Sequence, residues 1–95
     1  MKNCVDFLLF HVIISQKARK ASKRLPKKYR YRIIELLRFF RENPVPAEWY
    51  DIKKLKGYTD TYRARIGDLR IIYEIAWHQK SVHILVIKRR ENVYS

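Results

Sequence analysis

Residues 61–77 decide the fold, and they read TYRARIGDLRIIYEIAW. Apolar and polar side chains alternate from Thr61 to Ile66 and again from Leu69 to Trp77. Alternation with a period of two is typical of β-strands, and a glycine-containing dipeptide between two such stretches is typical of a hairpin loop. The sequence therefore predicts an antiparallel hairpin that turns at Gly67-Asp68.

A two-residue loop also fixes which side chains share a face of this hairpin. It pairs Ile66 with Leu69 and Arg65 with Arg70, and successive side chains then point to opposite faces. One face is apolar and is expected to pack on helices, whereas the other carries arginines. The apolar face contains Tyr62, Ala64, Ile66, Leu69, Ile71 and Tyr73, and the arginine face contains Arg63, Arg65 and Arg70.

The pairing of Arg65 with Arg70 is the most informative feature of the hairpin. Like charges directly opposite each other destabilise a sheet, and neither strand places a carboxylate beside them; Glu74 lies further along the same face. Planar guanidinium groups in fixed positions are well suited to phosphate oxygens. The pattern therefore indicates a phosphate site, and the competing interpretation is a solvated basic face.

Upstream of the hairpin, the sequence predicts one strand and two helices. Phe7 to Ile14 is rich in β-branched and aromatic residues, as strands are. Ser15 is suited to cap a short helix, and Pro26 to the first turn of a second one. The second helix has an apolar stripe formed by Tyr29, Ile33, Leu36, Leu37 and Phe40, and it stops at residues 43–46, NPVP.

Downstream, Val82 to Ile87 is predicted as the last strand and Lys88 to Ser95 as a polar tail, while Ala47 to Thr59 is predicted to be irregular. The expected fold class is α+β: an N-terminal strand, an antiparallel helical hairpin, and a three-stranded antiparallel meander that completes a twisted sheet. We expect one domain over residues 1–95, with residues 1–9 as an extension of the first strand.

The net charge of +13, from 22 Lys and Arg against 9 Asp and Glu, is an indication about partners. RNA, DNA or an acidic protein fits it better than a membrane surface does. The single cysteine, Cys4, excludes an internal disulfide and a cysteine-based zinc site. The three histidines are scattered without metal-ligand spacing, so no metal site and no cofactor is expected.

Two further basic segments are candidate RNA contacts. The tract from Lys17 to Arg32 places many cations across the helical hairpin, either as a solvated face or as a salt-dependent contact with RNA backbone. The tail carries Lys88 and Arg89 and then Tyr94, a candidate stacking platform or proton donor.

Several motifs, taken in order, resemble the RelE/ParE toxin superfamily, and archaeal RelE proteins in particular. They are the segments 23–26 (KRLP), 54–57 (KLKG), 62–73 (YRARIGDLRIIY) and 90–94 (RENVY). The likeness extends from about Phe10 onward.

The resemblance implies a cytoplasmic toxin of a type II toxin–antitoxin pair. RelE members enter the ribosomal A site and cut mRNA without metal, by attack of the ribose 2′-hydroxyl on the adjacent phosphate. It further implies a RelB-like antitoxin partner and is compatible with a toxin–antitoxin heterotetramer. Two alternatives stay open: a ParE-like inhibitor of DNA gyrase, and a degenerate RNA-binding module without catalysis.

By position, the resemblance also assigns residues. Arg63 and Arg65 fall where bacterial RelE has two lysines, and Arg70 falls on the strand arginine of the family. The catalytic set that the resemblance implies is Arg63, Arg65, Arg70, Arg90 and Tyr94, with Arg89 as the alternative to Arg90; it also places Leu55 at the site. Together with the cations of the basic segments, the candidate RNA-binding set is Lys20, Lys23, Lys27, Lys54, Leu55, Lys56, Lys88 and Arg89. Because arginine effectively cannot lose its proton, these exchanges leave the general base unassigned.

Overall fold

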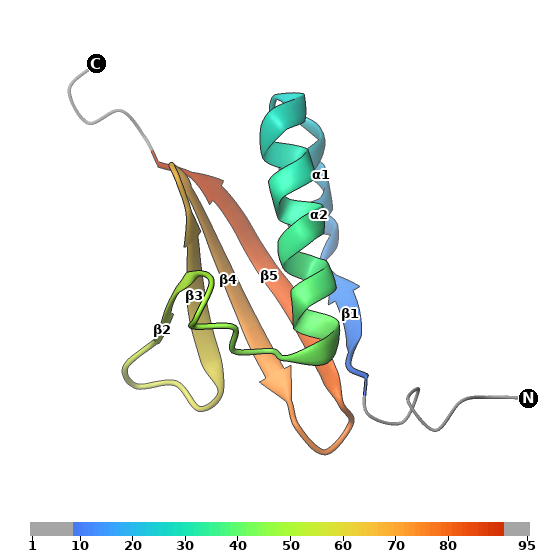
Figure 1. Cartoon of the computed structure of the whole chain (residues 1–95), viewed down its shortest axis with the longest axis vertical. Helices are drawn as coiled ribbons and strands as arrows, with labels where there is room; N and C mark the ends of the chain where they lie inside the picture. The colour runs from blue at the N-terminus through green and yellow to red at the C-terminus, as the bar shows by residue number, and fades with distance from the viewer. Residues whose placement is uncertain (1–8, 91–95) are drawn as a thin grey trace, which may run out of the picture.

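The computed structural model describes residues 9–90, which form two helices on one face of a five-stranded sheet (Figure 1). The elements are β1 (His11–Ile14), α1 (Gln16–Lys23), α2 (Lys27–Glu42), β2 (Asp51–Lys54), β3 (Thr61–Ile66), β4 (Leu69–Ala76) and β5 (Ser81–Arg89). The strand order is β1-β5-β4-β3-β2, in which β1 runs parallel to β5 and the other pairs are antiparallel. The predicted α+β class, helical hairpin and meander are confirmed.

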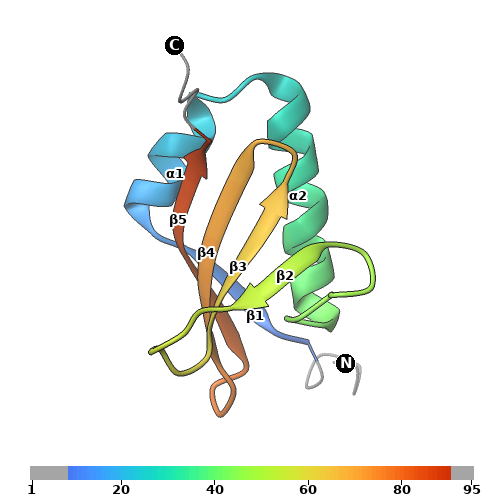
Figure 2. The same cartoon turned by 90° about the vertical axis from the view of Figure 1, so that its left-hand side faces the viewer.

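The opposite face of the sheet carries no helix. Figure 2 looks onto this face and shows β3, β4 and β5 in front with both helices behind them. We call it the open face. It is the face on which the arginines of the hairpin were expected.

Four strands differ from the predictions: β2 was not predicted, β4 ends one residue earlier, and β1 and β5 have other bounds. The prediction that residues 47–59 are irregular is wrong, because residues 51–54 form the edge strand β2. Its sequence, DIKK, is too short and polar to show a strand period, and pairing with β3 is what makes it a strand. The first strand covers only residues 11–14, with residues 1–8 outside the described part of the chain, and β5 is longer than predicted at both ends.

The hairpin has the predicted register. Ile66 pairs with Leu69 and Arg65 with Arg70 across the two-residue loop, in which Gly67 has a φ of +54°. A side chain would strain this left-handed backbone region, so glycine is favoured at the first loop position. The loop thus fixes the spacing of the arginines behind it.

Ser15 joins the helical layer to the sheet. Its hydroxyl accepts a hydrogen bond from the Ala18 amide at 3.0 Å, as the predicted N-cap of α1, and donates one to the Leu85 carbonyl at 2.9 Å. Leu85 is the extra residue where the pairing of β4 and β5 shifts register. Pro26 is the N-cap of α2, which begins at Lys27. The prediction placed Pro26 inside the first turn, so the helix begins after this proline instead of including it.

The core lies between the helices and the apolar face of the hairpin. Tyr73 is fully buried, its ring packs 4.3 Å from that of Phe40, and its hydroxyl donates to the Pro44 carbonyl at 2.8 Å. The predicted apolar stripe of α2 is buried here, apart from the partly buried Leu37. This packing holds the sheet rigidly and leaves its open face for other contacts.

Candidate nucleic-acid interface

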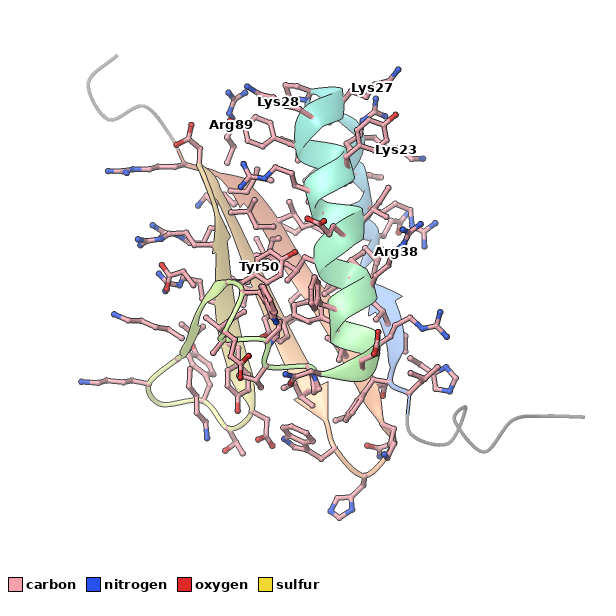
Figure 3. All side chains as sticks on the ribbon, in the orientation of Figure 1. Lys23, Lys27, Lys28, Arg38, Tyr50 and Arg89 are labelled. Carbon is pink, nitrogen blue, oxygen red and sulfur yellow. The ribbon has the colours of Figure 1, made fainter. Side chains whose placement is uncertain are left out.

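A row of charged residues crosses four strands of the open face. In register from β2 to β5 stand Asp51, Arg65, Arg70 and Lys88. All four are exposed, and hydrogen-bonded strands lie roughly 4.8 Å apart, so the backbone spaces these charges at regular intervals. Figure 3 shows nitrogen-tipped side chains projecting from this side of the sheet, away from the helices. The row holds three cations and one carboxylate.

Asp51 is the residue that sequence reasoning missed. Its carboxylate accepts a hydrogen bond from Arg63 at 3.2 Å and lies 3.9 Å from the Arg65 guanidinium. No acid of the two hairpin strands neutralises the arginines; Asp51 instead belongs to the edge strand β2, in a segment that was predicted to be irregular. Asp51 lies 12 residues before Arg63 in the chain, so no local sequence pattern links the two.

Arg63 is consequently held by the protein more than Arg65 is. Its side chain is only 10% exposed, compared with 48% for Arg65. Its Nε is buried without a hydrogen-bond partner. The structure thus separates the three arginines of the predicted face: Arg63 is buried beside Asp51, Arg65 is half-exposed and 3.9 Å from the same carboxylate, and Arg70 is exposed.

Arg90 joins the two exposed arginines at the end of the row. Its amide donates to the Asp68 carbonyl at 2.6 Å, which ties the end of β5 to the hairpin loop. Arg65, Arg70 and Arg90 all line one small cleft of about 30 Å³ at this loop. Within residues 9–90, no carboxylate forms an ion pair with Arg70 or Arg90. The predicted neighbour Tyr94 lies outside the described residues.

The remaining residues of the predicted RNA-binding set lie elsewhere. Lys54 is the last residue of β2 and pairs with Tyr62, away from the hairpin loop, and Leu55 and Lys56 follow it. Arg89 points to the helical side, where its guanidinium lies 5.1 Å from the centre of the Tyr29 ring (Figure 3).

The predicted helix cations form a second basic surface. Lys20, Lys23 and Lys27 are exposed on the helical layer, so the sheet separates them from the arginine row. The structure therefore presents two basic surfaces on opposite sides of the domain.

Metal and membrane features can be examined over the same part of the chain. Residues 9–90 contain no group of three or more His, Cys, Asp or Glu side chains that could hold a metal ion. Neither of the two helices in this range combines the length and the apolar character needed to cross a bilayer.

The fold and the arginine row define a class of protein: a small basic α+β domain with a rigid, cationic sheet face. Comparisons with known proteins agree on the family. A profile described as the ParE toxin of the type II toxin–antitoxin system parDE matches residues 12–94. The chain is also 39% identical over 85 residues to a candidate toxin of Methanocaldococcus jannaschii, RelE1, covering 90% of this chain and 94% of the relative.

Two solved structures are similar over nearly the whole chain. The RelE–RelB complex of Pyrococcus horikoshii matches with a TM-score of 0.81 and 38% identity, covering 90% of this chain and 99% of the matched one. The RelB–RelE antitoxin–toxin complex of Methanococcus jannaschii matches with a TM-score of 0.72 and 26% identity, covering 86% and 94%. This chain therefore belongs to the RelE/ParE family of type II toxin–antitoxin toxins, and the resemblance seen in the sequence is confirmed.

Proposed function

We propose that the protein is a cytoplasmic, ribosome-dependent endoribonuclease that cuts mRNA in the A site. The observation that carries the proposal is the group of Arg65, Arg70 and Arg90 around one cleft, with Lys88 in register beside Arg70. A phosphate bound there meets several cations whose backbone positions are fixed by the sheet and its loop.

The proposed reaction needs no metal ion and balances within the RNA. The ribose 2′-oxygen forms a bond to the adjacent phosphorus, and the bond from phosphorus to the 5′-oxygen breaks. The 2′-hydroxyl proton leaves and the 5′-oxygen gains a proton, which gives a 2′,3′-cyclic phosphate and a 5′-hydroxyl end. Negative charge accumulates on the phosphate oxygens in between, and preorganised guanidinium groups stabilise it.

The arginines do not serve as the general base, because a guanidinium effectively stays protonated. We assign positioning and charge stabilisation to Arg65, Arg70 and Arg90, with Tyr94 as a candidate proton donor. Ribosomal RNA then completes the site, and free RNA is a poor substrate. The helix-side cations, such as Lys20, contact ribosomal RNA backbone in a salt-dependent manner.

The test is primer extension on a message in a cell extract, with and without ribosomes. We expect cuts only where ribosomes translate, and loss of the cuts with Arg70→Ala. Lys20→Ala is the matched control, because it removes one exposed cation from the other basic surface; it should weaken ribosome binding modestly and lower its salt dependence.

Two results would contradict the proposal. If RNA without ribosomes were cut as fast as the translated message, the protein would be an ordinary ribonuclease. An intact message together with inhibited DNA supercoiling would instead support a gyrase inhibitor, the activity of ParE-type toxins that the sequence left open.

We also propose that the toxin pairs with a small acidic, RelB-like antitoxin. Two observations support this: both similar solved structures are complexes of a RelE with a RelB, and this chain has a net charge of +13. A heterotetramer of two toxins and two antitoxins is compatible with this pairing. Purification of the tagged toxin from its native operon should recover a stoichiometric acidic protein, and recovery of the toxin alone would contradict the pairing.

A further inference from the structure

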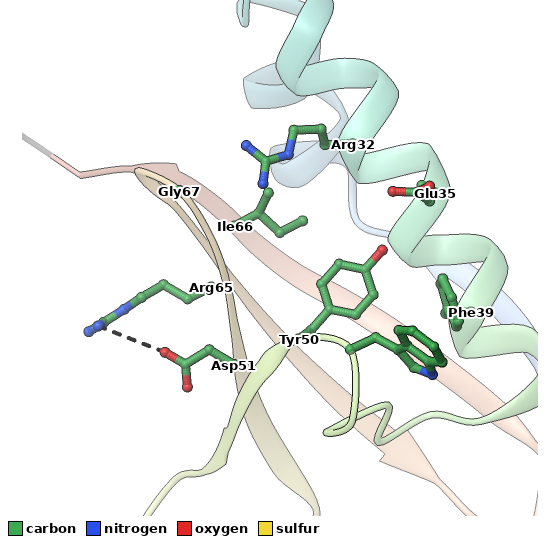
Figure 4. A pocket seen from close by; sticks show the side chains of 9 residues that line it. Arg32, Glu35, Phe39, Tyr50, Asp51, Arg65, Ile66 and Gly67 are labelled. Carbon is green, nitrogen blue, oxygen red and sulfur yellow. Dashed lines mark ion pairs between the residues drawn. The ribbon is translucent and has the colours of Figure 1, made fainter.

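A groove of about 380 Å³ lies on the helical side of the sheet edge, and Figure 4 shows it from close by. Arg32, Glu35 and Phe39 of α2 form one wall, and Trp49 and Tyr50 from the segment before β2 form the other. The volume is in the range of pockets that hold one small organic ligand. No feature of the sequence pointed to this groove, because its walls come from segments far apart in the chain.

Trp49 is the most exposed large hydrophobic side chain in the described part of the molecule, with 70% of its surface accessible. It is nevertheless supported, since its ring lies 6.2 Å from that of Phe39, and Phe39 in turn packs edge-on to Tyr50 at 5.5 Å. The Trp49 indole is therefore held in place by its neighbours and is still exposed to solvent. Such an indole can stack against a flat ring, as aromatic side chains do in RNA recognition.

Polar groups stand beside this aromatic wall. The Tyr50 hydroxyl points between Arg32 and Glu35 in Figure 4. Burial, and then the charge and hydrogen bond of Glu35, raise the pKa of Tyr50, while Arg32 partly offsets the rise. The groove thus offers a carboxylate acceptor, a phenol and guanidinium donors, which are groups that hydrogen-bond to the edges of nucleobases.

The charge of the groove distinguishes it from the open face. Two arginines, Arg32 and Arg65, are balanced by two acids, Glu35 and Asp51, among the lining residues. A phosphate or an acidic peptide gains little from such a balanced lining, whereas a neutral planar group is accommodated. The smaller cleft is lined by three arginines, Arg65, Arg70 and Arg90, and by one acid, Asp68, so its lining keeps a net positive charge.

Arg65 and Gly67 line both the groove and the arginine cleft, so the two sites are adjacent. We propose that the groove binds one nucleobase of the substrate RNA, stacked on Trp49, beside the phosphate held by Arg65. This inference rests on the proposed function, and it adds a base-binding subsite to the phosphate site.

The chain offers a matched pair of fluorescent probes, because it has two tryptophans. Trp77→Phe leaves Trp49 as the only indole, and Trp49→Phe leaves Trp77, which is 45% exposed and follows β4 at the end away from the hairpin loop. Both variants are titrated with a short single-stranded RNA whose 2′-hydroxyls are methylated, which blocks cleavage. Saturable quenching of Trp49, no quenching of Trp77, and weaker quenching by an RNA with abasic positions are the expected results.

Cleavage kinetics on translating ribosomes supply the second readout. Trp49→Ala should raise KM by roughly 5- to 150-fold with little change in kcat, because stacking binds substrate and transition state equally. Trp49→Phe should restore part of this loss. Arg65→Ala should lower kcat instead.

The outcomes separate the two proposals. Unquenched Trp49 together with a wild-type KM for Trp49→Ala would overturn the subsite while the nuclease proposal stands. Quenching of Trp49 by an acidic peptide but not by RNA would also overturn it, and would assign the groove to a protein partner. Absence of cleavage by the wild-type protein would refute the nuclease proposal, and the titration would still decide whether the groove binds a base.

Discussion

Replacing Asp51 with asparagine removes the charge beside Arg63 and keeps the size of the side chain. Arg63 is nearly buried, and its Nη2 donates to Asp51 at 3.2 Å, whereas the pair with Arg65 spans 3.9 Å between two half-exposed groups. Removing one partner of a fully buried pair costs roughly 3–5 kcal/mol, and an exposed pair contributes roughly 0–1 kcal/mol. Because the Asp51 side chain is 53% exposed, we expect Asp51→Asn to lower the free energy of unfolding by about 1–2 kcal/mol.

Urea denaturation in two double-mutant cycles measures how much of this loss comes from the pair with Arg63 and how much from the pair with Arg65. The cycles combine Asp51→Asn with Arg63→Met and, separately, with Arg65→Met. We expect a coupling energy of about 1–2 kcal/mol for Arg63 and below about 0.5 kcal/mol for Arg65. Equal couplings, a larger coupling for Arg65, or an unchanged unfolding midpoint for Asp51→Asn would refute the conclusion that Arg63 is the arginine held by the protein.

Three further changes test the scaffold. Ser15→Ala removes the cap on the Ala18 amide and should cost about 1–2 kcal/mol, measured by thermal unfolding. Gly67→Ala places a side chain at a φ of +54° and should cost about 1–2 kcal/mol in urea denaturation; no loss would mean that the loop relaxes. Burial raises the pKa of Tyr73 above its usual 10.0, so the neutral phenol stabilises the fold fully below pH 10, and this contribution is lost as pH rises above it. Tyr73→Phe, which loses the hydrogen bond to Pro44, should therefore show a smaller decrease in stability above about pH 10 than the wild type; parallel pH curves would contradict this.

Much of the fold could be predicted because local patterns and tertiary packing agree in the hairpin and in α2. The two-residue loop at Gly67 fixed the register, and alternation then assigned each side chain of β3 and β4 to a face. The apolar stripe of α2 identified its buried side in the same way. These predictions depend on neighbours in sequence, which is why they were correct.

The features that the sequence did not predict depend on contacts between segments that are far apart in the chain. The edge strand β2 has four residues with no apolar period, and only β3 makes it a strand, so Asp51 and its pair with Arg63 went unseen. The parallel pairing of β1 with β5 joins residues about 70 positions apart and leaves no local trace. The Trp49 groove likewise forms only when α2, the segment before β2, and the hairpin loop come together.

The most direct test of the arginine site is the rate of mRNA cleavage on translating ribosomes, measured for Arg70→Ala alongside its melting temperature. Arg70 is exposed and no described carboxylate pairs with it, so its removal should leave the melting temperature unchanged or slightly higher as repulsion from Arg65 is relieved. The cleavage rate should fall by roughly one to three orders of magnitude, as for the loss of one preorganised donor. Wild-type cleavage by Arg70→Ala, or a loss of cleavage that merely follows unfolding, would contradict the assignment of the arginine row as the site of phosphate chemistry.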